Sequence, residues 1–155
     1  MNPVQSFAMS LPHTYTSLLV HCVFSTKERR PVIAEAMQPR LWAFLGGIAR
    51  RNGMKALAVG GMADHAHVLI SIPATITVAK AMQYLKGGSS KWMNDQLPAR
   101  SFAWQENYSA FTLGVSQVPA TIRYIQNQKQ HHAKVSFDDE LKKFLDRHGI
   151  KQVER

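Results

Sequence analysis

The 155-residue sequence has one cysteine, few acidic residues and no apolar run long enough to cross a membrane. The lone Cys22 cannot form an internal disulfide, and its apolar surroundings indicate a small buried side chain. The N-terminus lacks the basic region and apolar block of a signal peptide. No repeat, low-complexity segment or linker divides the chain. These absences predict one cytoplasmic domain over residues 1–155, with an irregular leader at 1–13 and a C-terminal helix and tail at 134–155.

The charge balance is strongly basic. Lys and Arg number 19 against 10 Asp and Glu, which gives a formal net charge of +9 and a pI near 10.0. An excess of this size indicates a polyanionic partner, usually nucleic acid, or an anionic membrane surface. The alternative is that the charge only keeps the protein soluble. The hydrophobic content of 45% is that of a globular chain.

Hydrophobic periodicity predicts the element order β-α-β-β-α-β followed by C-terminal helices. The predicted strands lie at 14–26, 55–62, 65–73 and, as strand, turn and strand, 102–116. The predicted helices lie at 35–52, from the N-cap Thr77 to the polar stretch 94–101, and at 117–133 and 137–148. This order is typical of an α+β, ferredoxin-like fold, an antiparallel sheet with helices on one face, here with additional C-terminal helices. Such folds host many functions, so function must come from a site.

Two histidines interrupt the apolar strand sequence DHAHVLI. Because side chains alternate along a strand, His65 and His67 share one face, while Ala66, Val68 and Ile70 share the other. Two imidazoles placed side by side can hold one divalent cation. The alternative is that both are ordinary hydrogen-bonded histidines, so the pair needs a third ligand and a reaction.

Three kinds of phosphate-cleaving enzyme use paired histidines on strands. The histidine-triad hydrolases need a third histidine, where this chain has Leu69. The two-histidine phosphoesterases need two separate H-x-T or H-x-S motifs, which the sequence lacks. The third kind, the HUH nucleases, combines a metal held by two histidines with a distant tyrosine nucleophile.

The segment TIRYIQNQKQHH offers such a tyrosine. On a helix Tyr124 and Gln128 lie at i and i+4 on one face, so the phenol can supply the attacking oxygen while the amide oxygen reaches the metal. The alternative is that Tyr124 is an ordinary residue at a helix edge. His131 and His132 return to the same face, although helix C-termini also favour histidine for structural reasons.

Basic residues in two segments are the predicted DNA contacts. One cluster follows the first strand, and the other flanks the small-residue sequence GGSS, where a phosphate backbone could approach a helix closely. Close packing is the alternative for these glycines. The contacts are Lys27, Arg29, Arg30, Lys86, Ser89 and Lys91. Trp92 and Trp104 could stack unpaired bases or be buried in the core.

Four motifs in order, DHAHVLI, KGGSSKWM, FAWQENYSAF and RYIQNQKQHH, resemble the single-tyrosine HUH transposases of the smallest bacterial insertion sequences, the IS200-like family. The resemblance spans residues 14–133. It implies an intertwined homodimer whose composite sites combine the histidines of one subunit with the tyrosine of the other. The implied metal ligands are His65, His67 and Gln128, and the implied nucleophile is Tyr124.

The resemblance also implies the reaction. A metal-dependent transposase of this kind cleaves and rejoins single-stranded DNA at hairpin-bearing element ends through a 5′-phosphotyrosine, with Mg²⁺ or Mn²⁺ and without a nucleotide cofactor. Asp64, which a regular strand turns to the opposite face, is expected to hydrogen-bond near the hairpin turn rather than act as a base. The alternatives are a domesticated palindrome-processing relative, a non-catalytic ferredoxin-like nucleic-acid-binding module, and a phosphohydrolase of small substrates.

Overall fold

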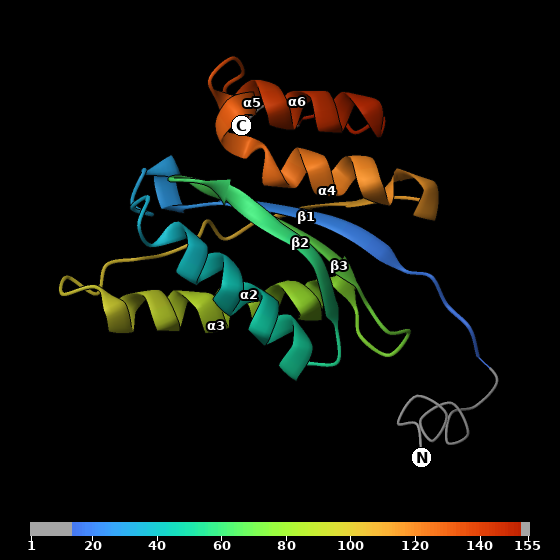
Figure 1. Cartoon of the computed structure of the whole chain (residues 1–155), viewed down its shortest axis with the longest axis horizontal. Helices are drawn as coiled ribbons and strands as arrows, with labels where there is room; N and C mark the ends of the chain where they lie inside the picture. The colour runs from blue at the N-terminus through green and yellow to red at the C-terminus, as the bar shows by residue number, and fades with distance from the viewer. Residues whose placement is uncertain (1–13, 153–155) are drawn as a thin grey trace.

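The computed structural model describes residues 14–152, so the predicted leader at 1–13 lies outside the described residues (Figure 1). All the strands lie in the first part of this region, together with two α-helices, and helices alone follow. In chain order the elements are β1 (Leu19–Ser25), the 3-10 turn η1 (Lys27–Arg29), α2 (Gln38–Arg51), β2 (Lys55–Met62), β3 (His65–Ser71), α3 (Val78–Gln96), β4 (Ser109–Thr112), the 3-10 turn η2 (Val115–Gln117), α4 (Val118–Gln126), α5 (Gln128–His132) and α6 (Phe137–Arg147).

The four strands form one antiparallel sheet in the order β2-β3-β1-β4, so β3 is a central strand. Val68 pairs with Cys22 of β1, and His67 pairs with Val23. The predicted alternation is confirmed, because Ala66, Val68 and Ile70 belong to the core beneath the sheet while the histidines face the other side. The buried Cys22 in the same core is also as predicted.

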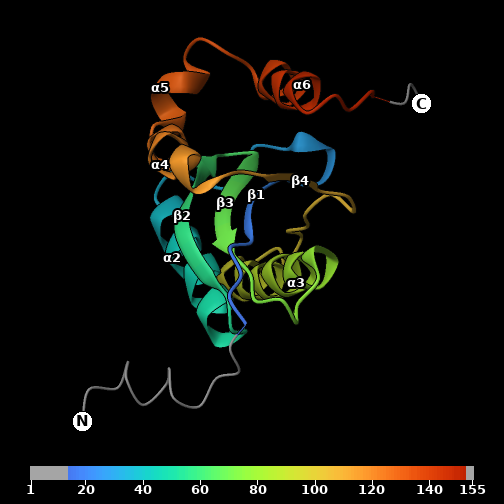
Figure 2. The ribbon, with the colours of Figure 1, turned by 90° about the vertical axis from the view of Figure 1, so that its right-hand side faces the viewer.

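Helices cover both faces of this sheet (Figures 1 and 2). α2 and α3 pack on one face and enclose the main hydrophobic core with Leu41, Leu45 and Leu85. α4 packs on the opposite face through Ile125 against Leu69, and α6 packs there through a second, smaller cluster. The predicted α+β fold, with two helices on one face and additional C-terminal helices, is therefore confirmed. The additional helices enclose the face that carries the histidines.

Local capping explains where several helices begin. The Thr77 side chain accepts a hydrogen bond from the Lys80 amide, as expected of an N-cap, and Ser136 does the same for α6 through the Asp139 amide. Pro119 lies in the first turn of α4, where its missing N–H costs nothing. No helix among residues 14–152 is long and apolar enough to cross a membrane.

Two predicted elements differ from the structure. The first half of the predicted strand pair at 102–116 is not a strand. Trp104 makes one isolated bridge to Thr26, and its side chain is buried in the core. The predicted helix at 117–133 is divided at Asn127, whose φ of −102° and ψ of 26° leave the helical region. Asparagine competes with helical hydrogen bonding in this way, and the break reorients the residues that follow it.

Candidate active site

His65 and His67 lie on the face of β3 that the C-terminal helices cover, and both are fully enclosed, at 1% and 0% exposure. Each ring is fixed through Nδ1 by a neighbouring side chain. Asp64 Oδ1 lies 2.8 Å from Nδ1 of His65, and Nε2 of His21 lies 2.8 Å from Nδ1 of His67. This leaves both Nε2 atoms to face one centre, which is how partner groups commonly orient metal-binding histidines. The sequence prediction for Asp64, a hydrogen bond near the turn, is thus refined to a contact with His65.

Tyr124 and Gln128 come to the same centre from α4 and α5. The rings of Tyr124 and His67 meet edge to face, with centroids 5.6 Å apart. Gln128 is buried; its Oε1 lies 3.0 Å from Nε2 of His65, and its amide nitrogen donates to the Tyr124 carbonyl at 3.2 Å. The helix break at Asn127 therefore does not separate Tyr124 from Gln128. Within the chain, the histidines and Tyr124 therefore lie side by side. That two subunits share each site stays a prediction of the family resemblance.

A carboxylate that the sequence analysis missed completes the cluster. Glu140 of α6 is 2% exposed; its Oε1 lies 2.8 Å from Nε2 of His67, and its Oε2 accepts a hydrogen bond from the Tyr124 hydroxyl. His132 also reaches Glu140, with Nε2 3.0 Å from Oε2. The sequence pattern could have indicated Glu140. It lies three residues after Phe137, on the buried stripe of α6, where a solvated carboxylate is not expected.

The electrostatics of the cluster follow from its burial. Burial and the hydrogen bond to Glu140 raise the pKa of Tyr124 well above its ordinary value, so the phenol keeps its proton at neutral pH. Burial alone would raise the pKa of Glu140, but hydrogen bonds from His132 and His67 outweigh it and hold that pKa below its usual range. Burial lowers the pKa of His21 to about 3, and it also lowers that of His67. Burial would lower the pKa of His132, but the hydrogen bond to Glu140 and the charge of that carboxylate outweigh it and raise that pKa. The site therefore combines an ionised carboxylate with neutral rings at His21 and His67.

Comparison with known proteins identifies the family of the chain. The family described as "Transposase IS200 like" matches residues 14–128, about three quarters of the sequence.

The chain belongs to this family.

Two transposases are similar to most of this chain. The transposase of insertion sequence element IS200 from Salmonella typhimurium is 30% identical over 111 residues, which cover 68% of this chain and 73% of that protein. The ISDra2 transposase TnpA from Deinococcus radiodurans is 25% identical over 114 residues, covering 70% and 81%. The match to the family ends at Gln128, so Glu140 lies beyond it.

Solved structures support the fold of this IS200-like transposase. A Deinococcus radiodurans R1 protein described as a transposase superposes with a TM-score of 0.61 at 24% identity, covering 77% of this chain and 96% of that one. A REP-associated tyrosine transposase bound to a REP hairpin superposes with a TM-score of 0.58 at 13% identity, covering 81% and 75%. At these identities the likeness establishes the architecture.

The donor set of the transposase fits a divalent metal ion. His65, His67, His132 and Glu140 each offer a ligand atom, and these atoms lie within 4.8 Å of one another. Opposite ligands of one ion lie roughly 4 Å apart, so a small inward movement would suffice. Because His21 is neutral, it can donate to or accept from Nδ1 of His67. His67 thus keeps this hydrogen bond whether its Nε2 carries a proton or binds a metal.

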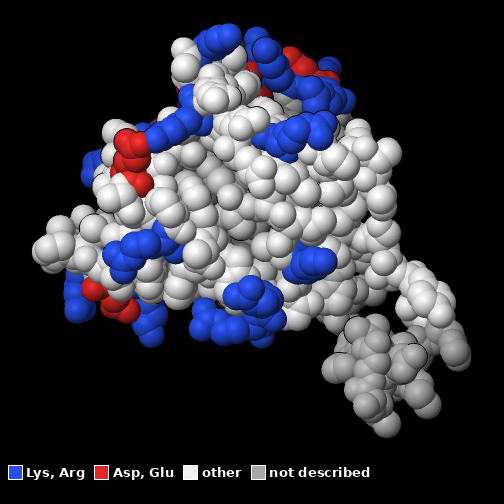
Figure 3. All heavy atoms as spheres, in the orientation of Figure 1, with Lys and Arg blue, Asp and Glu red and all other residues white. Residues whose placement is uncertain are grey.

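The predicted DNA contacts are not all at the surface. Basic side chains outnumber acidic ones on the face drawn in Figure 3, with groups over the C-terminal helices and along the opposite edge. Lys27, Arg29, Arg30 and Lys91 are exposed, and Lys86 is half-buried. The prediction that Ser89 contacts DNA is wrong.

Ser89 is fully buried in the transposase, so its hydroxyl cannot contact DNA. The hydroxyl donates to the Leu85 carbonyl at 2.6 Å and accepts from Nε1 of Trp104 at 2.9 Å. The neighbouring glycine is explained by packing: a Cβ on Gly88 would come within 2.9 Å of the Ile48 side chain. Gly88 therefore lets α3 pack closely against α2.

Proposed function

We propose that this IS200-like transposase cleaves and rejoins single-stranded DNA, with Tyr124 as the nucleophile and a divalent metal held beside it. The main support for this proposal is that side chains from separate elements meet at one place. The Tyr124 hydroxyl, the His65–His67 pair and the buried Glu140 come from separate elements of one chain and meet within hydrogen-bonding distance. Burying polar and charged groups is costly. Such a cluster is therefore not expected in a module that only binds nucleic acid.

The reaction would be a transesterification. The phenolic oxygen of Tyr124 attacks the scissile phosphorus, the bond to the 3′ oxygen breaks, and a 5′-phosphotyrosine and a free 3′-OH result. Glu140 already accepts the hydrogen bond of the hydroxyl, so its carboxylate is positioned to take the phenolic proton. That proton then goes to the departing 3′ oxygen, which leaves as the free 3′-OH. A later 3′-OH displaces Tyr124 from the phosphate and rejoins the strand, with the proton returning to the phenol.

The residues that would hold the metal are His65 and His67, joined by Glu140 and His132, with Gln128 beside them. When bound, the ion would stabilise the negative charge that develops on the phosphate and the phenolate. Three imidazoles favour Mn²⁺ over Mg²⁺, because Mg²⁺ prefers oxygen ligands. We therefore expect calorimetric titration with the metal alone to give tighter binding of Mn²⁺, lost in His65→Ala.

The substrate is proposed to be single-stranded DNA with hairpins. The family membership, the net charge of +9 and the REP hairpin bound by the structurally similar tyrosine transposase support this proposal. The proposed contacts are Lys27, Arg29, Arg30, Lys86 and Lys91, with Ser89 removed from the predicted set. The homodimer remains a prediction of the family resemblance.

The test is covalent capture. Labelled hairpin-bearing single-stranded DNA is incubated with the protein and Mn²⁺ or Mg²⁺, and a DNA adduct is sought on a denaturing gel. We expect the parent protein and Tyr108→Phe, a matched change at a partly exposed tyrosine outside the site, to form it, and Tyr124→Phe to form none. Absence of an adduct from the parent protein on every hairpin substrate would overturn the proposal.

A mixing experiment tests whether one chain supplies the whole site. Because Tyr124 lies beside His67 of its own chain, combining His65→Ala protein with Tyr124→Phe protein should leave both inactive, even in a mixed oligomer. Restored cleavage in the mixture would instead place the tyrosine and the histidines of each site on different subunits.

A further inference from the structure

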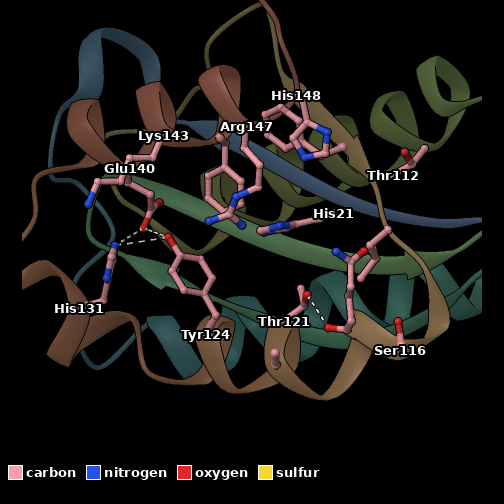
Figure 4. Close-up of a pocket in the computed structure, with 15 residues that line it drawn as sticks. His21, Thr112, Ser116, Thr121, Tyr124, His131, Glu140, Lys143, Arg147 and His148 are labelled. Carbon is pink, nitrogen blue, oxygen red and sulfur yellow. Dashed lines mark hydrogen bonds and ion pairs between the residues drawn. The ribbon is translucent and has the colours of Figure 1, made fainter.

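A pocket of about 760 Å³ lies beside Tyr124, between α4 and α6 (Figure 4). Thr121 and Tyr124 of α4 form one wall, and Lys143 and Arg147 of α6 form the opposite one. The volume is within the range of roughly 300–1,000 Å³ that is typical of small-ligand sites. Only the end near Tyr124 belongs to the cluster described above, so the remainder of the pocket needs its own explanation.

The Glu140 carboxylate lines the end of the pocket near Tyr124, and beyond it the α6 wall is positively charged. Neither Lys143 nor Arg147 has an ion-pair partner among residues 14–152. The two side chains are four residues apart and therefore lie one helical turn apart on the same face, where like charges repel. An anion held between them would remove this repulsion, and a phosphate group matches both the charge and the hydrogen-bonding geometry of an arginine.

The inner part of the pocket is aromatic. Phe144 stacks on Phe111 with ring centroids 5.3 Å apart, and His148 stacks on the same ring at 4.8 Å. Across from these rings, Ser116 and Gln117 bring a hydroxyl and an amide to the lining. Aromatic rings stack with nucleobases of any sequence, and polar side chains can hydrogen-bond to base edges.

We propose that this pocket binds the nucleotide that flanks the scissile phosphate, with its base against Phe144 and its phosphate on Lys143 and Arg147. This inference rests on the proposed function, because it is the attack by Tyr124 that makes the neighbouring nucleotide the natural occupant. It assigns α6, which lies beyond the residues matched to the family, a direct part in substrate binding. The nucleotide would enter between α4 and α6, so that the scissile phosphate next to it meets the phenol of Tyr124.

Binding of deoxynucleoside monophosphates to the full chain carrying Tyr124→Phe tests this site without requiring cleavage. NMR titrations compare a deoxynucleoside 5′-monophosphate with deoxyribose 5-phosphate and with inorganic phosphate. We expect the nucleotide to bind at least about fivefold more tightly than the sugar phosphate, because only the nucleotide can stack on the aromatic rings. Equal affinity of all three probes would mean that the pocket binds an adventitious anion only, which would overturn the proposal.

Charge-matched variants locate the bound phosphate. The double variant Lys143→Gln with Arg147→Gln should weaken nucleotide binding roughly tenfold, since it removes both charged donors. Lys142→Gln with Lys151→Gln removes the same charge at exposed positions outside the pocket and should change the affinity less than about twofold. Equal losses in the two double variants would refute the site and leave only general electrostatic attraction.

The outcomes separate this inference from the proposed function. Nucleotide binding that is lost in the Lys143→Gln, Arg147→Gln protein, combined with no covalent adduct from the parent protein, would support the pocket but reject the Tyr124 chemistry. An adduct on Tyr124, combined with no preference for the nucleotide over inorganic phosphate, would support the chemistry and reject the pocket.

Discussion

Replacing Glu140 by leucine should destabilise the fold because three side chains hydrogen-bond to this buried carboxylate. It accepts hydrogen bonds from His67 at 2.8 Å, from His132 at 3.0 Å and from the Tyr124 hydroxyl, and it is 2% exposed. Leucine fills a similar volume but accepts nothing, so Nε2 of the fully buried His67 is left without its partner. Leaving a buried donor without its acceptor costs about 1–3 kcal/mol. The loss should therefore be a large part of a marginal total stability.

Chemical unfolding in urea, followed by circular dichroism at pH 7 with a chelator present, measures this loss. The control is Asp139→Leu, which introduces the same side chain at the next, exposed position of α6. The control removes one favourable charge from the first helical turn and should cost less than about 1 kcal/mol. A loss from Glu140→Leu no larger than that of the control would refute the network.

The difference between the parent protein and Glu140→Leu should also depend on pH with a definite sign. The folded-state pKa of Glu140 is below its ordinary value of 4.5, so the carboxylate stabilises the fold fully above that pH. The stabilisation is lost as the pH falls through the folded-state pKa. We expect the difference to be complete at pH 7 and to narrow below about pH 4.5. A difference that widens with acid would contradict the assigned hydrogen bonds.

Three further predictions concern the rest of the fold. Ser89→Ala should cost about 1–3 kcal/mol of unfolding free energy, because the indole N–H of Trp104 loses its acceptor, and should leave DNA affinity unchanged in an anisotropy titration. Cys22, whose pKa burial raises to about 12, should react with a disulfide reagent at pH 8 only after urea unfolds the protein; fast reaction of the native chain would contradict its burial. Gly60→Ala should lower thermal stability, since the new Cβ would clash with the backbone carbonyl of Ile125; an unchanged melting temperature would contradict this close approach of α4.

The sequence predicted the part of the site that depends on local periodicity. Strand alternation placed His65 and His67 on one face, and helical spacing brought Gln128 near Tyr124 even though the helix breaks between them. These relations hold because they involve residues close in the chain. The architecture followed for the same reason, from the order of short periodic segments.

The remaining part depends on how distant elements pack, which local patterns do not encode. Glu140 joins the site only because α6 folds back over the sheet, and His21 supports His67 only because β1 pairs with β3. Ser89 was predicted as a DNA contact because it lies in a small-residue, basic segment, but the packing of α3 on the core buries it. The sequence indicated a role for Glu140 in one way, because this carboxylate lies on an apolar stripe of its helix.

The measurement that tests the central claim most directly is identification of the residue that carries DNA after cleavage. Arg123 and Lys129 flank Tyr124, so trypsin would release the peptide of residues 124–129 with any attached nucleotide. The account predicts that mass spectrometry finds this peptide joined through Tyr124 to a 5′ phosphate, with a free 3′-OH on the other DNA product. A nucleotide found on any other residue, or cleavage with no protein-linked product, would contradict it.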